Sequence, residues 1–269
     1  MPKWLEAGLW GTLAGAALVI GALIGIYANV PKRVVALVMA FGAGVLVSAL
    51  CFELMDEAFH IGGLVPTGAG FLLGAVIYAG VNFALARYGA RHRKRSSVQP
   101  KRDGDPEESG TALMVGALVD GVPESIVIGL SLLSGGAVSF VAVIAIFLSN
   151  IPEGLSSAAG MKARGRSPRR ILASWCVITL VSGLSSVIGY TLFRNASPEL
   201  VAATTAVAAG GILAMLADTM VPEAFDEAHD LAGLVTVLGF LVSFALSKSD
   251  PKAEPTPHPS ASSKSLKDR

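Results

Sequence analysis

The apolar stretches of this 269-residue chain contain no lysine and no arginine. Cysteine is almost absent as well, because the only two, Cys51 and Cys176, lie inside apolar stretches, which excludes a disulfide framework and a cysteine metal centre. Charged residues make up only 15% of the chain, whereas apolar residues make up 52%. Apolar runs that lack a polar face at helical spacing do not form the core of a soluble protein, so the sequence predicts a membrane protein.

Uncharged runs of about twenty residues, the length that crosses roughly 30 Å of hydrocarbon, recur along the chain. The first run is too long for the core of a signal peptide and is expected to stay in the protein. The sequence therefore predicts an all-α membrane protein with eight transmembrane helices, at about residues 8–29, 34–56, 64–86, 111–133, 137–161, 171–193, 199–222 and 231–247.

Basic residues gather in alternate loops, above all in residues 87–102 and 162–170. By the positive-inside rule these loops are cytoplasmic, which places both termini outside, and the compact chain fits a prokaryotic cytoplasmic (inner) membrane. The basic run Arg91–Arg95 then serves topology and does not bind nucleic acid. The expected partners are membrane lipid and metal ions, and a homodimer stays an open option.

The first three runs resemble the last three. Leu54–Phe59 reads LMDEAF and Met220–Phe225 reads MVPEAF, and each is followed by a histidine and a Gly-Leu pair. Since the second and seventh runs cross in opposite directions, the repeats are inverted, in a 3+2+3 arrangement typical of transporters. The predicted parts are a first three-helix repeat (1–86), a basic, flexible cytoplasmic loop (87–110), a central metal-binding helix pair (111–161), a second basic loop (162–170), a second three-helix repeat (171–247) and a disordered tail (248–269).

The two central runs each carry a proline followed by a glutamate, Pro123-Glu124 and Pro152-Glu153. A proline inside a helix cannot donate to the carbonyl four residues earlier, so each proline kinks its helix and frees a carbonyl oxygen one turn before the glutamate. Each glutamate also has polar neighbours about one turn earlier on its own face: Asp120 for the first, and Ser149 and Asn150 for the second.

Two such helices facing each other could gather three carboxylates, an amide, a hydroxyl and bare carbonyls around one point. Carboxylates at membrane depth without a basic partner must keep their protons or hold a cation, and a divalent ion would offset both their mutual repulsion and the cost of burying them. The alternative is that Pro-Glu only kinks each helix. Candidates for the ion route are Glu53, Asp218, Glu57, Glu223 and Ser149.

These features resemble the ZIP (Zrt-/Irt-like) metal permeases over nearly the whole chain except the tail. The family patterns His-Asn-x-Pro-Glu-Gly and His-Asn-Ile-Pro-Glu-Gly correspond to Asp120–Ser125 and Ser149–Gly154. The resemblance implies transport of Zn²⁺, or of Fe²⁺, Mn²⁺ or Cd²⁺, into the cytoplasm. It implies that the protein is a transporter and not an enzyme. It also implies four metal ligands: Asp120, Glu124, Asn150 and Glu153.

The chain departs from the family at both histidines, at positions 120 and 149. Gly121 lacks an amide that helps to bridge a second metal, and Ser186 stands where a sixth-helix glutamate is found, so a single-metal site is expected. Oxygen ligands suit harder ions than imidazole does, which favours Mn²⁺ or Fe²⁺ beside zinc. The alternative function is a non-transporting metal sensor or scaffold that has lost its histidines. An intramembrane hydrolase using Asp120 and Asp218 is a weaker rival, because no nucleophile motif accompanies them.

Overall fold

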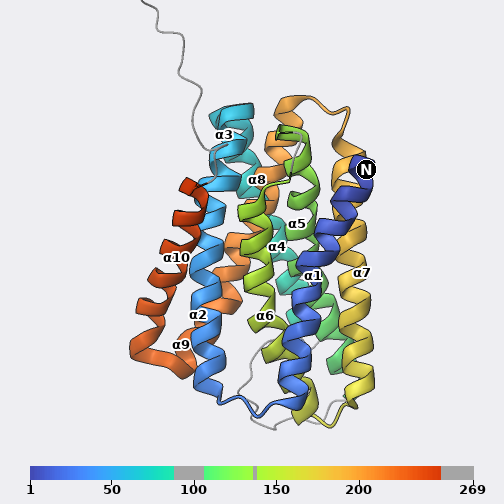
Figure 1. The fold of residues 1–269 in the computed structure, drawn as a ribbon, viewed down its shortest axis with the longest axis vertical. Helices are drawn as coiled ribbons and strands as arrows, with labels where there is room; N and C mark the ends of the chain where they lie inside the picture. Colours follow the sequence, from blue (N-terminus) through green and yellow to red (C-terminus); the bar gives the residue numbers. More distant parts are fainter. Residues whose placement is uncertain (88–105, 136–137, 250–269) are drawn as a thin grey trace, which may run out of the picture.

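The computed structural model describes residues 1–87, 106–135 and 138–249, and most of the predicted loop and nearly all of the predicted tail fall outside these described residues. Within them every regular element is helical (Figure 1). In chain order they are α1 (Lys3–Tyr27), α2 (Lys32–Ala49), η1 (Leu50–Met55), α3 (Asp56–Gly62), α4 (Leu64–Arg87), α5 (Pro106–Gly135), α6 (Phe140–Ala163), α7 (Pro168–Phe193), α8 (Pro198–Met215), η2 (Leu216–Met220), α9 (Val221–Ala228), η3 (His229–Leu231) and α10 (Ala232–Ser249). The segments η1 and η2 are π-helical, and η3 is a 3₁₀ turn.

The observed helices overlap the predicted runs, but several of their bounds differ by about five residues. Helix α1 begins at Lys3 and not near residue 8, and the helical stretch that starts as α2 continues to Gly62 and does not end near residue 56. Helix α5 begins at Pro106 and not near residue 111, so the end of the predicted 87–110 loop is helical. Seven helices in the described part of the chain are long and apolar enough to cross a membrane. The prediction was eight. The two numbers differ because the predicted seventh and eighth spans fall in one continuous 52-residue helical stretch, Pro198–Ser249, which is counted once.

That 52-residue stretch reverses its direction near its middle. His229 has a φ of 37°, a backbone conformation that non-glycine residues seldom adopt outside turns. The 3₁₀ turn η3 follows, and α10 then runs back along the bundle beside α2 (Figure 1). The stretch therefore contains two antiparallel rods joined at His229.

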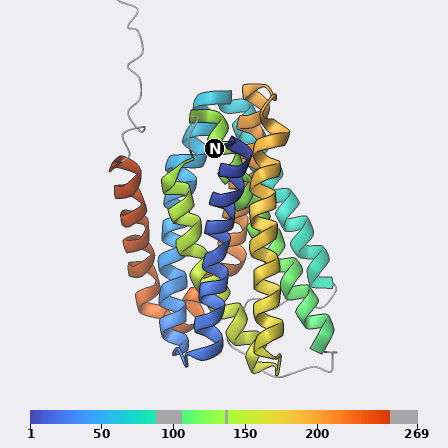
Figure 2. The same cartoon turned by 45° about the vertical axis from the view of Figure 1, so that its right-hand side comes forward.

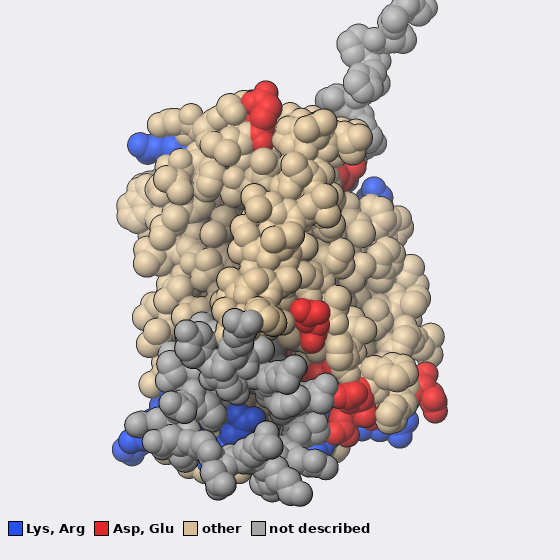
Figure 3. All heavy atoms as spheres, turned by 180° about the vertical axis from the view of Figure 1, so that it is seen from behind, with Lys and Arg blue, Asp and Glu red and all other residues tan. Residues whose placement is uncertain are grey.

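The outer surface of the bundle is apolar. Large side chains such as Leu72, Leu180 and Leu192 are each 68% exposed, far more than a soluble protein leaves uncovered in a continuous surface. Seen from behind, lysine and arginine lie near the two ends of the molecule, and the band between them is mostly uncharged (Figure 3). This surface suits contact with lipid chains, and the protein is an all-α, multi-pass integral membrane protein.

Helices from the two predicted repeats pack against each other at very short range. Helix α2 lies along α10, and α8 lies along α4 (Figure 2). A Cβ atom on Gly44 would lie 1.9 Å from the carbonyl oxygen of Thr236, and one on Gly210 would lie 1.9 Å from that of Phe71. Only glycine permits this approach, as is common where membrane helices pack closely. The second helix of each repeat thus pairs with the third helix of the other.

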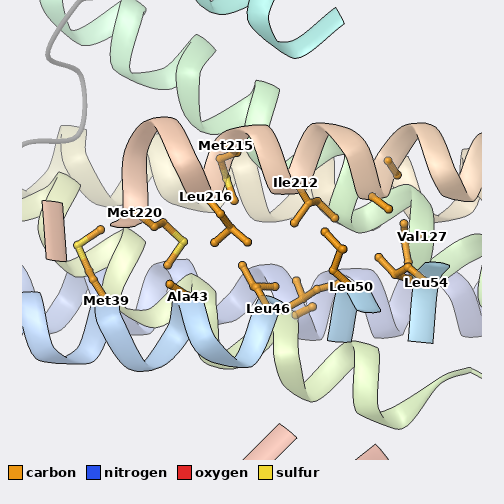
Figure 4. Packing of buried hydrophobic residues seen from close by; sticks show 14 of the residues in the cluster. Met39, Ala43, Leu46, Leu50, Leu54, Val127, Ile212, Met215, Leu216 and Met220 are labelled. Atoms are coloured by element: carbon orange, nitrogen blue, oxygen red, sulfur yellow. The ribbon is translucent and has the colours of Figure 1, made fainter. Parts of the chain in front are cut away.

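The apolar core lies mainly between α2 and α8. Figure 4 shows side chains of the two helices pointing toward one another, namely Met39, Ala43 and Leu46 from α2 and Ile212 and Met215 from α8, continued by Leu50 and Leu54 of η1 and by Leu216 and Met220 of η2. Between Leu46, Ile146 and Ile212 the remaining space is only about 10 Å³, at the lower limit for a single water molecule. This pocket is apolar and too small for a hydrated ion.

Candidate metal-binding site

The four predicted metal ligands lie on α5 and α6, and all four are buried. Their exposed fractions are 3% for Asp120, 1% for Glu124, 4% for Asn150 and 5% for Glu153. Each predicted kink proline lies inside its helix, Pro123 in α5 and Pro152 in α6, and the helix continues on both sides of it. The four residues thus lie in the interior of the bundle and within their helices.

Helix α1 holds the ligand-bearing part of α6 in place. The Asn150 side-chain nitrogen donates a hydrogen bond of 3.0 Å to the carbonyl oxygen of Ala14. One turn further, a Cβ atom on Gly154 would lie 2.2 Å from the carbonyl oxygen of Leu18, so the two backbones touch there. This hydrogen bond fixes the orientation of the Asn150 amide, whose Oδ1 atom is the one that could bind an ion.

Polar contacts on the same helix connect the site to α9. The Ser156 hydroxyl donates to Glu223 Oε1, and Glu223 is only 5% exposed. Ser156 lies three residues after Glu153, about one turn along α6, so Glu223 approaches the helix next to the predicted ligand. Ser149, in contrast, donates to the carbonyl oxygen of Ile146 at 3.0 Å, within its own helix. Of the predicted route residues, Glu223 is therefore the one that the structure brings to α6 beside Glu153.

Glu53 lies well away from Glu153. Its carboxylate accepts hydrogen bonds from Ser139, at 3.0 Å, and from Ser247, at 2.6 Å. Ser139 is the N-cap of α6 and precedes Glu153 by 14 residues, which at 1.5 Å per residue is about 20 Å along the helix. Glu53 therefore joins η1 to the start of α6 and the end of α10.

Asp218 occupies the matching place in the second half of the chain. It lies in η2, as Glu53 lies in η1, and its Oδ2 atom accepts a 3.1 Å hydrogen bond from the side-chain nitrogen of Asn82 on α4. Asp218 is exposed and Glu57 is half-buried. Each of the two π-helical segments thus carries an acid that is bound to a helix of the other predicted repeat.

In this conformation no three His, Cys, Asp or Glu side chains in the described ranges lie close enough together to hold a metal ion. The carboxylates of α5 and α6 are buried, but a cage that used all three would require them to move toward one another. The three-carboxylate cage stays a prediction.

Sequence reasoning missed the hydroxyl groups that bind the acids. Ser139 is the N-cap of α6, whereas Ser156 and Ser247 lie within α6 and α10, and no motif in the sequence marks any of the three as a partner of an acid. Ser156 alone carried a weak signal, because it follows Glu153 by one turn on the same face. Ser186, expected from the family comparison to lie at the site, is fully buried between Gly11 of α1 and Gly129 of α5.

Buried carboxylates on two proline-containing helices, inside an apolar bundle, define an integral membrane protein with an acidic interior. No protein-family model matches the chain. The chain is similar to relatives named "Zinc transporter ZupT". One from Escherichia coli O7:K1 (strain IAI39 / ExPEC) is 31% identical over 218 residues, and one from Salmonella arizonae (strain ATCC BAA-731 / CDC346-86 / RSK2980) is 30% identical over 222 residues. A third, from Enterobacter sp. (strain 638), is 29% identical over 218 residues. Each match covers 78% of this chain and 83% of the relative.

At this identity and coverage the particular family is settled. The chain belongs to the ZIP (Zrt-/Irt-like) family of divalent metal permeases.

Proposed function

We propose that this protein moves divalent metal ions, with Zn²⁺ as the first candidate, across a membrane toward the cytoplasm. The observation that supports the proposal most is the burial of Asp120, Glu124 and Glu153 inside a bundle whose outer surface is apolar. A charge at membrane depth costs roughly 2.5–3.5 kcal/mol on insertion scales, and a divalent cation offsets that cost. The relatives, named zinc transporters, indicate which ion to test first.

The proposed topology has eight spans in a 3+2+3 order. The stretch Pro198–Ser249 crosses twice, once as α8 to α9 and once as α10, because the chain reverses at His229. The amino-terminal end of α1 and the carboxyl-terminal end of α10 lie at the same end of the bundle (Figure 1). The positive-inside rule places that end outside the inner membrane and the basic segment Lys162–Arg170 in the cytoplasm.

In the proposed mechanism, Asp120, Glu124 and Glu153 neutralise the ion and Asn150 Oδ1 completes its shell. The apolar layer formed by Leu46, Leu50, Leu54 and Ile212 closes the path on the side of the termini. Glu223, bound to Ser156 further along α6, then accepts the ion on the cytoplasmic side. Motion of the α5–α6 pair against the two repeats would open the closed side in turn.

Uptake into liposomes that contain the purified full-length protein tests this proposal. Glu124→Gln and Glu153→Gln each remove one negative charge while keeping the side-chain shape. Loss of a charged interaction of about 1.5–3 kcal/mol corresponds to a decrease in Zn²⁺ affinity of roughly 10- to 100-fold. Asp230→Asn, at an exposed acid in η3, is the matched control and is expected to transport normally.

Two results would contradict the proposal in different ways. If both glutamine variants transport Zn²⁺ like the parent, the ligands are misassigned. If the parent binds Zn²⁺ and gains thermal stability but transports none, the protein is a sensor and not a permease. Parallel uptake assays with Fe²⁺, Mn²⁺ and Cd²⁺ measure whether the oxygen-rich ligand set extends the substrate range beyond zinc.

A further inference from the structure

Two glycines lie next to predicted ligands in the chain, Gly154 after Glu153 and Gly121 after Asp120, and their surroundings differ. Gly154 on α6 is required by packing, because a Cβ atom there would lie 2.2 Å from the carbonyl oxygen of Leu18. At Gly121 on α5 a Cβ atom would meet, among the described residues other than its immediate chain neighbours, only the Ser182 hydroxyl oxygen, at 4.0 Å. Packing therefore does not require a glycine at position 121, which leaves space for a small group.

This space lies at the flank of the ligand face of α5. Gly121 follows Asp120 directly and precedes Glu124 by three residues, so it is about 60° around the helix from Glu124. Asp120 and Glu124 are buried, whereas Gly121 is half-buried. The space beside Gly121 is thus both close to the carboxylates and less enclosed than they are.

Ser182 forms the polar wall of this space. It is 4% exposed and is fixed against α1, because a Cβ atom on Gly15 would lie 2.9 Å from the Ser182 Cβ. The carbonyl oxygen of Gly121 is already used, since it accepts a 2.7 Å hydrogen bond from Ser125. The Ser182 hydroxyl is therefore the polar group from outside α5 that faces the space, and a hydroxyl can both donate to and accept from a water molecule.

We infer that the space beside Gly121 receives a water molecule bound to the transported ion, and that the Ser182 hydroxyl positions this water. The inference rests on the proposed function and deepens it. A buried water needs two to four polar partners. The ion, the Ser182 hydroxyl and the nearby Glu124 carboxylate supply them.

The consequence is a preference among ions. Zinc is satisfied by four ligands, whereas Mn²⁺ favours six oxygens in octahedral geometry. Three carboxylates and the Asn150 oxygen can saturate zinc but leave Mn²⁺ short of ligands. Ser182 is thus a positioning residue that allows the site to carry an ion with part of its hydration shell.

The test compares Mn²⁺ with Zn²⁺ uptake in liposomes that hold the full-length protein. Ser182→Ala removes the hydroxyl, and Gly121→Ala fills the space without a clash. Both are expected to lower the ratio of Mn²⁺ to Zn²⁺ uptake about tenfold. X-ray absorption of the Mn²⁺-bound protein should show one oxygen neighbour fewer in each single variant.

Two control variants separate this effect from general damage. Ser243→Ala removes a serine of α10 that is 2% exposed, and Gly80→Ala adds a methyl group at a glycine of α4 where no atom of the described residues lies within 4 Å. Neither should change the uptake ratio. An unchanged ratio and an unchanged oxygen count in both Ser182→Ala and Gly121→Ala would overturn the inference while leaving metal transport intact. A parent protein that moves neither ion would instead overturn the proposed function, and the oxygen count would still decide whether the water is present.

Discussion

Replacing Gly44 with alanine should separate α2 from α10. An added Cβ atom would lie 1.9 Å from the carbonyl oxygen of Thr236, whereas non-bonded contacts are optimal near 3.5 Å. The helices must therefore move apart by roughly 1.5 Å, and overpacking of this kind costs about 1–3 kcal/mol or more. The inverted repeat predicts that Gly210→Ala destabilises the protein by a similar amount. An added Cβ atom there would lie 1.9 Å from the Phe71 carbonyl oxygen.

Gly80→Ala provides the reference for this experiment. It lies within α4, and in the part of the chain that the structure describes no atom would lie within 4 Å of the added Cβ, so the variant gains only the higher helix propensity of alanine, about 1 kcal/mol. The other two variants gain the same propensity, and the difference between each of them and Gly80→Ala isolates the packing cost. At about 2–4 °C per kcal/mol, the midpoint of thermal unfolding in detergent should lie roughly 2–12 °C lower for Gly44→Ala than for Gly80→Ala. Equal midpoints would refute the close approach of α2 and α10.

Three further changes test the polar contacts. Asn150→Asp keeps an oxygen for the ion but cannot donate to the Ala14 carbonyl, so the thermal midpoint should fall by an amount that corresponds to about 1–3 kcal/mol, with Zn²⁺ partly restoring it. Ser247→Ala removes one of the two hydrogen bonds to Glu53 and should lower the midpoint by an amount that corresponds to about 1.5–3 kcal/mol, whereas Ser249→Ala at an exposed position should not. Glu223→Gln should slow Zn²⁺ uptake while Zn²⁺ binding, measured by calorimetry, stays near that of the parent; equal losses in both would place Glu223 in the binding site itself.

Much of the fold follows from local sequence properties. Runs such as Lys3–Tyr27 are apolar on every side, and only a helix satisfies all backbone groups of such a run in lipid. Helix ends were harder to place, because the propensity of residues 106–110 for a loop or a helix depends on what they pack against. The reversal at His229 was anticipated as the boundary between two runs, but the 37° φ at that residue has no sequence signal.

The candidate site was predictable only in part. The burial of Glu124 and Glu153 followed from their position inside apolar runs, and their helical neighbours followed from spacing. The partners supplied by other helices did not, because the bond from Asn150 to Ala14 joins residues 136 positions apart. Such contacts depend on which helices become neighbours, and composition and periodicity do not encode that choice.

Each of the two π-helical segments changes the direction in which the side chains that follow it point, relative to the side chains that precede it. A π turn bonds each residue to the fifth one along and so accommodates one residue more than an α turn, which rotates everything beyond it by about 100°. In a regular helix Leu46 and Glu57, eleven positions apart, would share a face, but η1 lies between them. A scanning experiment that assigns lipid-facing and interior positions from a single helical wheel will therefore misplace the acids that follow residue 55. Deleting one residue from η1 should swing Glu57 to a different side of the rod, and the same logic holds for η2 and Glu223.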